Sequence, residues 1–256
     1  MMKVCFIGSG NVATVLAKLL HSKGYIITEV YSKDVQHANL LAEKVQAKAV
    51  NTIAEISLQS DIYIIAVADK AIAEIASHLF VVDKLVLHTA GSVSKNVLQT
   101  TSTNYGCLYP IQSIRKDMEI TTPIPFMIDG NSDKGILAIE NMVKSLQQKF
   151  VLGNDEHRLK LHVAAVFACN FVNYMYLQSA TFCENENIDF TILQSLIEET
   201  ATRLQNQHPQ EVFTGPAARR DMATINKHLD LLQPYPDMYE LYKKLSELII
   251  EKANEN

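Results

Sequence analysis

The sequence lacks the features that mark secreted, membrane-spanning and metal-binding proteins. Its four cysteines form no C-x-x-C pair, and no histidine lies at zinc-finger spacing from any of them, so neither disulfides nor a metal site is expected. The longest apolar runs, such as IYIIAVA, are far shorter than the roughly 20 residues of a membrane-spanning helix. The first strand pattern begins almost at once, without the pattern of a signal peptide. We therefore expect a cytoplasmic protein with reduced thiols and no membrane partner.

An excess of positive charge is also lacking. The formal net charge is −5 and the pI about 5.9, and no basic face is evident that could neutralise phosphates, so a nucleic-acid partner is not expected. Apolar residues make up 48% of the chain and charged residues 20%, which is ordinary for a globular protein. The length of 256 residues predicts one large domain or two modest ones.

Glycine is scarce, yet two of the nine glycines lie one residue apart in the stretch IGSGNVA. The stretch follows an apolar strand pattern and opens a helical one. Gly8 permits the sharp turn, Gly10 lets a ligand approach the backbone, and Ala13 is small enough for the helix to pack closely on the strand. The free N–H groups at the start of the helix favour a pyrophosphate. The motif therefore predicts a dinucleotide site; the alternative is a glycine-rich turn that binds no nucleotide.

The first 150 or so residues alternate strand and helix patterns. The strand patterns are near-continuous apolar runs, which is typical of parallel strands buried on both faces. The predicted strands are Lys3–Ile7, Ile26–Tyr31, Asp61–Ala66, Lys84–His88, Gly106–Tyr109, Phe126–Asp129 and Lys149–Leu152. Their alternation with helices predicts a doubly wound, mainly parallel sheet of the Rossmann type.

Strand patterns stop after Gly153, and only helices are expected beyond it. The predicted helices are Asn154–Asn185, Phe190–Asn206 with Asp189 as its N-cap, Pro216–Leu232 with Thr214 as its N-cap, and Asp237–Ala253. The sequence thus predicts a dinucleotide-binding domain over residues 1–153 and an all-α domain over residues 154–256, which would hold substrate.

The end of the second strand indicates which dinucleotide binds. Ser32 and Lys33 stand at its tip, and a hydroxyl next to an ammonium suits a 2′-phosphate, so we expect NADP(H) rather than NAD(H). Two acidic residues argue the other way: Glu29 has the right distance from Gly8 but lies inside the strand, and Asp34 follows the tip. The residues expected to contact the coenzyme are Gly8, Ser9, Gly10, Asn11, Val12, Ser32, Lys33, Ala66, Val67 and Ala68.

Catalytic candidates follow the next strands, because ligands of an open parallel sheet bind at the carboxyl ends of its strands. His88 could deliver a proton, since imidazole titrates near neutral pH; the alternative is a buried, neutral histidine. Ser92 is expected in the same pocket, or else as a helix cap. Gln112 is a candidate for binding substrate.

Polar residues on the apolar first helix of the second half are further candidates. At about 100° per residue, His162, Asn170 and Asn173 fall within an arc of about 80°. Such groups either form hydrogen bonds between domains or contact substrate. We take Asn170 as a catalytic candidate and Asn173 as a substrate-binding one.

The stretch TGPAARRDM supplies the last candidate, Arg219. In the predicted helix over Pro216–Leu232, Arg219 stands in the first turns, where a cation is disfavoured by the helix dipole. An arginine kept at that cost could bind an anionic substrate; an Arg–Asp pair at a subunit interface is the alternative.

These motifs resemble those of a known family. IGSGNVA, VYSKD, AVADKAI, LHTAGS, YPIQS, CNF and TGPAARRD are similar to motifs of uncharacterised NADP oxidoreductases that join a Rossmann-like domain to a helical domain of unknown function. The first 150 residues also resemble the coenzyme-binding domains of deazaflavin-dependent NADP reductases and pyrroline-5-carboxylate reductases. The resemblance implies NADP as cofactor, C-terminal helices like those of 6-phosphogluconate dehydrogenases, and a homodimer formed through these helices.

The chain departs from the family pattern at a few positions. The family tends to have histidine where Tyr109 stands and glycine where Arg220 stands, so the resemblance gives position 109 no proton-transfer role. Related β-hydroxyacid dehydrogenases carry a catalytic lysine where Val166 stands, which argues against a hydroxyacid substrate. We expect an NADP(H)-dependent oxidoreductase that transfers hydride to or from a small carbonyl or imine compound between its two domains. The alternative is a non-catalytic NADP(H)-binding redox sensor or assembly protein.

Overall fold

The computed structural model describes residues 1–119 and 122–253 and divides into two compact units. The sheet unit comprises Met1–Asn170 and the helical unit comprises Phe171–Asn256. The division falls later in the chain than the predicted boundary after Gly153. The reason is that α5 (Asp155–Ala165) belongs with the sheet: its Arg158 is buried there, with only 1% of its surface exposed.

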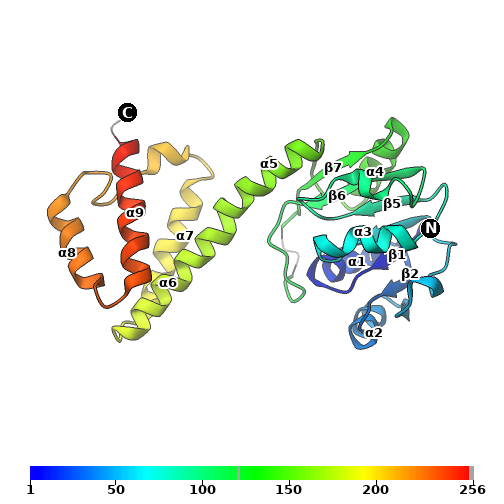
Figure 1. Cartoon of the computed structure of the whole chain (residues 1–256), viewed down its shortest axis with the longest axis horizontal. Helices are drawn as coiled ribbons and strands as arrows, with labels where there is room; N and C mark the ends of the chain where they lie inside the picture. The colour runs from blue at the N-terminus through cyan, green and yellow to red at the C-terminus, as the bar shows by residue number, and fades with distance from the viewer. Residues whose placement is uncertain (120–121, 254–256) are drawn as a thin grey trace. The chain divides into compact units, whose positions relative to one another are not determined.

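An eight-stranded sheet forms the centre of the sheet unit (Figure 1), in the order β3-β2-β1-β4-β5-β6-β7-β8. The strands are β1 (Lys3–Ile7), β2 (Ile26–Tyr31), β3 (Lys48–Val50), β4 (Ile62–Ile65), β5 (Leu85–His88), β6 (Asn104–Pro110), β7 (Phe126–Gly130) and β8 (Phe150–Leu152). The pairings are parallel except that between β6 and β7, which is antiparallel. The carboxyl ends of β1, β2, β4, β5 and β6 consequently lie at the same edge of the sheet.

Helices cover both faces of this sheet. Alternate residues of each strand enter opposite cores, because successive side chains of a strand point to opposite faces. Phe6 and Ile64 pack with α1 (Asn11–Ser22), α2 (Val35–Lys44) and α4 (Asp133–Ser145). Ile7 and Ile65 pack with α3 (Asp69–His78) and the 3₁₀ helix Lys95–Leu98.

Seven of these strands agree with the prediction from the sequence to within two residues at each end, and helices alternate with them as predicted. The prediction missed β3, which has only three residues and therefore no apolar run long enough to recognise.

The helical unit contains α6 (Val172–Asn185), α7 (Gln194–Arg203), α8 (Met222–Leu232) and α9 (Pro236–Lys252), with short 3₁₀ helices at Phe190–Leu193 and Pro209–Val212. Asp189 caps the first 3₁₀ helix as predicted, by accepting a hydrogen bond from the Thr191 N–H. Among the helices of the described residues, none is long and apolar enough to cross a membrane.

The helix predicted over Pro216–Leu232 is wrong in its first six residues. Gly215 and Arg220 have φ angles of 99° and 56°, which no α-helix accommodates. The helix begins instead at Met222, and Asp221, not Thr214, is the cap that accepts a hydrogen bond from the Thr224 N–H. The reasoning that placed a cation in the first helical turn at position 219 is therefore wrong, because Arg219 lies in the turn before α8.

The helix predicted over Asn154–Asn185 is present but not uniform. Between α5 and α6 the residues Val166–Phe171 form a π-helical segment, with the wider turn that one extra residue produces. The constant rotation of about 100° per residue therefore fails between His162 and Asn173. Segments of this kind are frequent at functional sites.

Candidate functional site

A cavity of about 560 Å³ opens at the carboxyl ends of the parallel strands. We call it the glycine-loop cavity. Its lining includes all ten residues that the sequence predicted to contact the coenzyme: Gly8, Ser9, Gly10, Asn11, Val12, Ser32, Lys33, Ala66, Val67 and Ala68. Asp69, Ile75, Thr89, Ala90 and Gly91 extend the lining, with Tyr31 and His162. The structure thus brings the predicted residues into one cavity; no observation tests their contact with a coenzyme.

The two glycines of the loop have different structural roles. Gly8 has a φ of 120°, and a Cβ atom there would lie 2.1 Å from the carbonyl oxygen of Ala66, so the fold itself requires glycine. A Cβ atom on Gly10 would have no protein atom within 4 Å. The backbone at Gly10 therefore faces open space in the cavity, where a ligand can approach it closely.

The start of α1 at this cavity is electrostatically suited to an anion. Gly10 is the N-cap and offers no side-chain hydrogen bond, and no acidic residue stands in the first turn. The N–H groups of the first turn are therefore left for a ligand, and the helix dipole adds a partial positive charge. This combination favours a phosphate group at the glycine loop.

The charged residues in and after β2 differ in whether they line the cavity in which the ribose is predicted to bind. Lys33 lines the cavity, and its Nζ lies 3.2 Å from Oε1 of Glu74, with both side chains largely exposed. Glu29 is only 5% exposed and accepts a hydrogen bond from the Ser57 N–H, outside the cavity. Asp34 caps α2 by accepting from the Gln36 N–H. Neither acidic residue is therefore among those that line the cavity.

A second cavity, of about 550 Å³, adjoins the first. We call it the tyrosine cavity. Its lining comprises Val12, Thr89, Tyr109, Pro110, Ile111, Gln112, Ser113, Leu161, His162, Ala164, Ala165, Ala168, Cys169 and Asn170. Val12, Thr89 and His162 line both cavities, so the two meet at these residues.

Tyr109 and His162 form a hydrogen-bonded pair where the cavities meet. The Tyr109 hydroxyl lies 3.0 Å from Nδ1 of His162, and the two rings pack edge to face. Both side chains rest against Gly91, where a Cβ atom would come within 2.9 Å of the His162 ring and 3.0 Å of the Tyr109 ring. Burial raises the pKa of Tyr109, so its phenol stays protonated over the physiological range.

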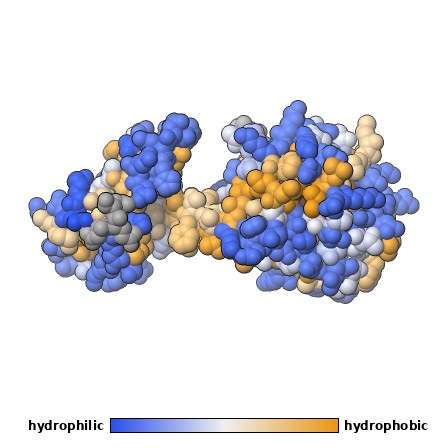
Figure 2. Space-filling model, turned by 90° about the horizontal axis from the view of Figure 1, so that it is seen from above, coloured by the Kyte–Doolittle hydropathy of each residue, from blue (hydrophilic) through white to orange (hydrophobic). Residues whose placement is uncertain are grey.

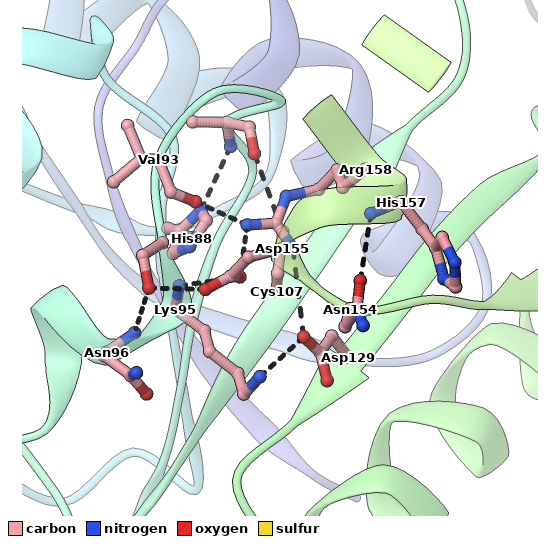
Figure 3. Close-up of polar contacts among 12 residues, drawn as sticks. His88, Val93, Lys95, Asn96, Cys107, Asp129, Asn154, Asp155, His157 and Arg158 are labelled. Atoms are coloured by element: carbon pink, nitrogen blue, oxygen red, sulfur yellow. Dashed lines mark hydrogen bonds and ion pairs between the residues drawn. The ribbon is translucent and has the colours of Figure 1, made fainter. Parts of the chain in front are cut away.

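A buried polar cluster fixes α5 to the sheet (Figure 3). Arg158 donates to the Val93 carbonyl and, at 2.7 Å, to Asp155, while Lys95 pairs with Asp129 at 2.7 Å. Asp155 also accepts from the Lys95 backbone N–H at 3.1 Å. Because His162 lies one helical turn beyond Arg158 on α5, this cluster also sets the position of His162.

His88 does not line either cavity. It is fully buried beside Arg158 and Cys107 (Figure 3), and its Nδ1 accepts a hydrogen bond from the Ala90 N–H at 3.2 Å. Burial, with a further contribution from the Arg158 charge, lowers the pKa of His88 to about 4. The geometry therefore matches the buried, neutral histidine that the sequence left as the alternative, and does not favour a proton donor.

The remaining predicted residues divide between the cavities and the rest of the chain. Gln112 and Asn170 line the tyrosine cavity. Ser92 lines neither cavity, but its hydroxyl donates to the carboxylate of Asp69, which lines the glycine-loop cavity. Asn173 and Arg219 belong to the helical unit and line neither cavity, so their substrate contacts stay predictions.

Sequence reasoning missed the pairing of Tyr109 with His162. Both had a signal: Tyr109 ends a strand at the ligand edge, and His162 is a polar residue on an apolar helix. Their 53-residue separation conceals that they meet. Within the described residues, no group of histidine, cysteine or acidic side chains is placed to hold a metal ion.

Two family descriptions match the chain. "NADP oxidoreductase coenzyme F420-dependent" matches residues 3–90, which include the glycine loop, and "Domain of unknown function (DUF2520)" matches residues 124–249. Comparison with curated proteins gives no match.

Among solved structures, "putative NADP oxidoreductase BF3122" from Bacteroides fragilis is 36% identical to this chain, with a TM-score of 0.91 and 98% of each chain covered. Identity at this level over the whole length shows the family. The chain belongs to the family of NADP oxidoreductases in which the coenzyme F420-dependent type of N-terminal domain precedes DUF2520.

More distant structures share the fold. Pyrroline-5-carboxylate reductase from Streptococcus pyogenes is 14% identical, with a TM-score of 0.69, and the match covers 100% of this chain and 99% of that one. A reductive aminase from Aspergillus terreus in complex with NADPH is also 14% identical, with a TM-score of 0.74 and coverages of 100% and 95%. These matches confirm the predicted fold class, a mainly parallel α/β sheet followed by helices.

Proposed function

We propose that the protein is an NADP(H)-dependent oxidoreductase that transfers a hydride between the nicotinamide ring and a small carbonyl or imine carbon. The observation that carries this proposal is the Gly10 backbone, which faces open space at an uncapped helix start inside the glycine-loop cavity. Membership of the NADP oxidoreductase family supports it, as does the reductive aminase of the same fold that was crystallised with NADPH.

The charges at the cavity favour NADP(H) over NAD(H). A free ribose 2′-hydroxyl is gripped by an acidic side chain, whereas a 2′-phosphate needs a cation. Glu29 and Asp34 are engaged outside the cavity, and Lys33 with the Ser32 hydroxyl lines it. We therefore expect Lys33 to exchange Glu74 for the 2′-phosphate when the coenzyme binds.

The chain's own residues orient the coenzyme. The N–H groups at the start of α1 would hold the diphosphate, and the backbone from Thr89 to Gly91 would seat the nicotinamide ring beside His162. The coenzyme, when bound, would supply the hydride. The protein would hold the nicotinamide ring and the substrate carbon in the orientation that hydride transfer needs.

Calorimetric titration of the Gly10→Val variant tests the proposal. We expect the wild-type protein to bind NADPH more tightly than NADH, and the variant to lose at least about 100-fold in NADPH affinity, which is about 2.8 kcal/mol. Because a Cβ atom there would have no protein atom within 4 Å, the variant should still fold, with a melting temperature without coenzyme only about 2–4 °C below the wild type, the cost of valine at the N-cap.

Gln36→Val is the matched control, since it places the same side chain on an exposed position of α2 outside both cavities. It should bind NADPH as the wild type does. If Gly10→Val binds NADPH normally, or if the wild type binds neither coenzyme below millimolar concentration, the proposal is wrong. A sensor without catalysis would bind NADPH in the same way but consume none with any acceptor.

We further propose that a second copy of the chain packs on an apolar stripe at the start of the helical unit. This stripe consists of Phe171, Tyr174 and Leu177, each between 46% and 58% exposed. Apolar residues reach the surface of the molecule in several places, as Figure 2 shows in orange. An exposed apolar stripe on one face of a helix marks an interface.

A further inference from the structure

We propose that the tyrosine cavity binds an uncharged carbonyl or imine compound, and that Tyr109, supported by His162, delivers the proton to its oxygen or nitrogen. The proposal rests on the proposed hydride transfer and adds to it the class of substrate and the source of the proton. It replaces His88, which is buried away from both cavities.

The lining of the tyrosine cavity carries no formal charge apart from any on the imidazole of His162. It is built from apolar side chains with a few neutral polar groups, among them the amides of Gln112 and Asn170. No lysine or arginine among the described residues lines it to neutralise a carboxylate or a phosphate. Burying an unpaired anion there would be costly, so an uncharged compound fits best.

The position of the pair suits the transfer of a proton and a hydride to adjacent atoms. Thr89 and His162 line both cavities, so a carbonyl group at their junction would be within reach of both the seat of the nicotinamide ring and the Tyr109 hydroxyl. The adjacent Gly91 allows the two rings to pack this closely, since a Cβ atom there would collide with both.

The hydrogen bond between the two side chains determines the direction of proton transfer. When Nδ1 of His162 carries a proton and donates to the Tyr109 oxygen, the phenol proton is free to point at the substrate. Tyr109 keeps that proton over the physiological range because burial raises its pKa. Donation from Nδ1 stabilises the phenolate as it forms.

One hydride and one proton are transferred in each turnover. The carbonyl or imine carbon forms a C–H bond with the hydride of the reduced nicotinamide, which is oxidised. The electron pair of the C=O or C=N double bond moves to the oxygen or nitrogen, which takes the phenol proton of Tyr109. The phenolate regains its proton from the solvent by relay through His162, whose Nε2 takes up a solvent proton as Nδ1 gives its own proton to the phenolate. The product is an alcohol or an amine.

Arg158 acts as a positioning residue for this pair. It is 1% exposed and ties α5 to the Val93 carbonyl and to Asp155, one helical turn before His162. Without these contacts of Arg158, Tyr109 and His162 would both still be present, but α5 would be free to shift and move the His162 ring relative to the Tyr109 ring. Its role is therefore distinct from proton delivery.

The substrate class is tested with two compounds of the same skeleton, methyl levulinate and levulinate, added to the NADP⁺-loaded protein and followed by ligand-detected NMR. We expect the uncharged ester to bind at least about tenfold more tightly than the carboxylate. Ala168→Phe, which fills the tyrosine cavity alone, should abolish the signal of the ester. The proposal is overturned if levulinate binds as tightly, if neither binds at about 10 mM, or if binding survives Ala168→Phe.

The proton donor is tested by NADPH consumption with the ester or with cyclohexanone as acceptor. Tyr109→Phe removes one hydroxyl and should lower kcat by about 100-fold or more with KM changed by less than about threefold. His162→Gln should lower kcat by about tenfold. Tyr105→Phe is the matched control, because Tyr105 lies on the same strand but lines neither cavity. It should turn over as the wild type does.

An unchanged kcat in Tyr109→Phe would overturn the assignment of Tyr109. Failure of the proposed function gives different results, namely no binding of NADPH to the wild type in the calorimetric titration, or binding without NADPH consumption with any acceptor. A shift of KM alone in Tyr109→Phe would mean that the hydroxyl only binds substrate.

Discussion

The two units differ in how much of their apolar surface they bury by themselves. The sheet unit has a continuous core on each face of its sheet, and side chains such as Phe6 and Ile64 are fully buried. In the helical unit, the buried residues among those described are only Cys183, Ala217, Ile225, Leu232 and Ser246. The buried apolar core therefore lies mainly in the sheet unit, whereas the helices of the other unit bury few apolar side chains and expose many, such as Leu177.

The units also differ in their buried polar groups. The sheet unit buries His88, Arg158 and Asp129 in one cluster, and the helical unit buries no acidic, basic or histidine side chain among its described residues. Buried polar networks of this kind fix geometry when their members are paired. The buried polar cluster therefore fixes the geometry of the sheet unit, and both the glycine-loop cavity and the tyrosine cavity lie in this unit.

The largest effect is expected in the core of the sheet. Phe6→Ala removes a fully buried ring and should lower the free energy of unfolding by about 3–5 kcal/mol, through lost apolar burial and the cavity left behind. Urea denaturation measures this, and the loss should be the same at every protein concentration, because Phe6 lies inside one chain. A loss below about 1 kcal/mol would contradict the contrast between the units.

The acid sensitivity of the fold should originate in the sheet unit, at His88. Its pKa in the folded protein is about 4, below the ordinary 6.5, so protonation favours the unfolded chain. Stability from this group is complete above pH 6.5 and is lost as the pH falls from 6.5 to 4, by about 3 kcal/mol. Below pH 4 the folded protein also takes up the proton, and the loss stops.

Urea denaturation at several pH values checks this prediction against His88→Gln. Whatever the substitution costs at pH 7, the variant should lose about 3 kcal/mol less than the wild type between pH 7 and pH 4. Parallel pH profiles for the two proteins would show that His88 is not the group responsible.

The smallest effect is expected at the exposed stripe. Leu177, on α6, is 58% exposed, so Leu177→Ala should leave the stability of the dissociated chain within about 0.5 kcal/mol of the wild type. If a second copy covers the stripe, the variant should associate about tenfold more weakly, which is about 1.4 kcal/mol. Sedimentation velocity over a range of concentrations measures it. A wild-type protein that stays monomeric throughout would contradict the proposed dimer.

The fold was largely predictable because parallel strands buried on both faces leave long apolar runs. The errors have local causes. Pro216 after Thr214 resembles the start of a helix. Gly215 and Arg220 have positive φ angles, however, which interrupt the helix and which the sequence does not show. β3 is too short to leave a pattern.

The site was predictable in part. The glycine loop and the residues expected at the ends of neighbouring strands are short stretches of sequence, so their meeting in one cavity followed from the rule that ligands bind at the carboxyl ends of parallel strands. His88 was chosen because it titrates and ends a strand, but in a strand with apolar residues on both faces the sequence does not show which way a side chain points. The pair of Tyr109 and His162 depends on how α5 lies on the sheet, which Arg158 and Asp155 determine from within the fold.

A crystal structure of the protein with NADP⁺ tests the central claim most directly. We predict that the diphosphate lies within hydrogen-bond distance of the N–H groups of Asn11 and Val12, that the 2′-phosphate contacts Lys33, and that the nicotinamide ring lies beside Gly91 and His162. A coenzyme bound elsewhere, or one whose adenine occupies the end of the cavity at His162, would contradict the account.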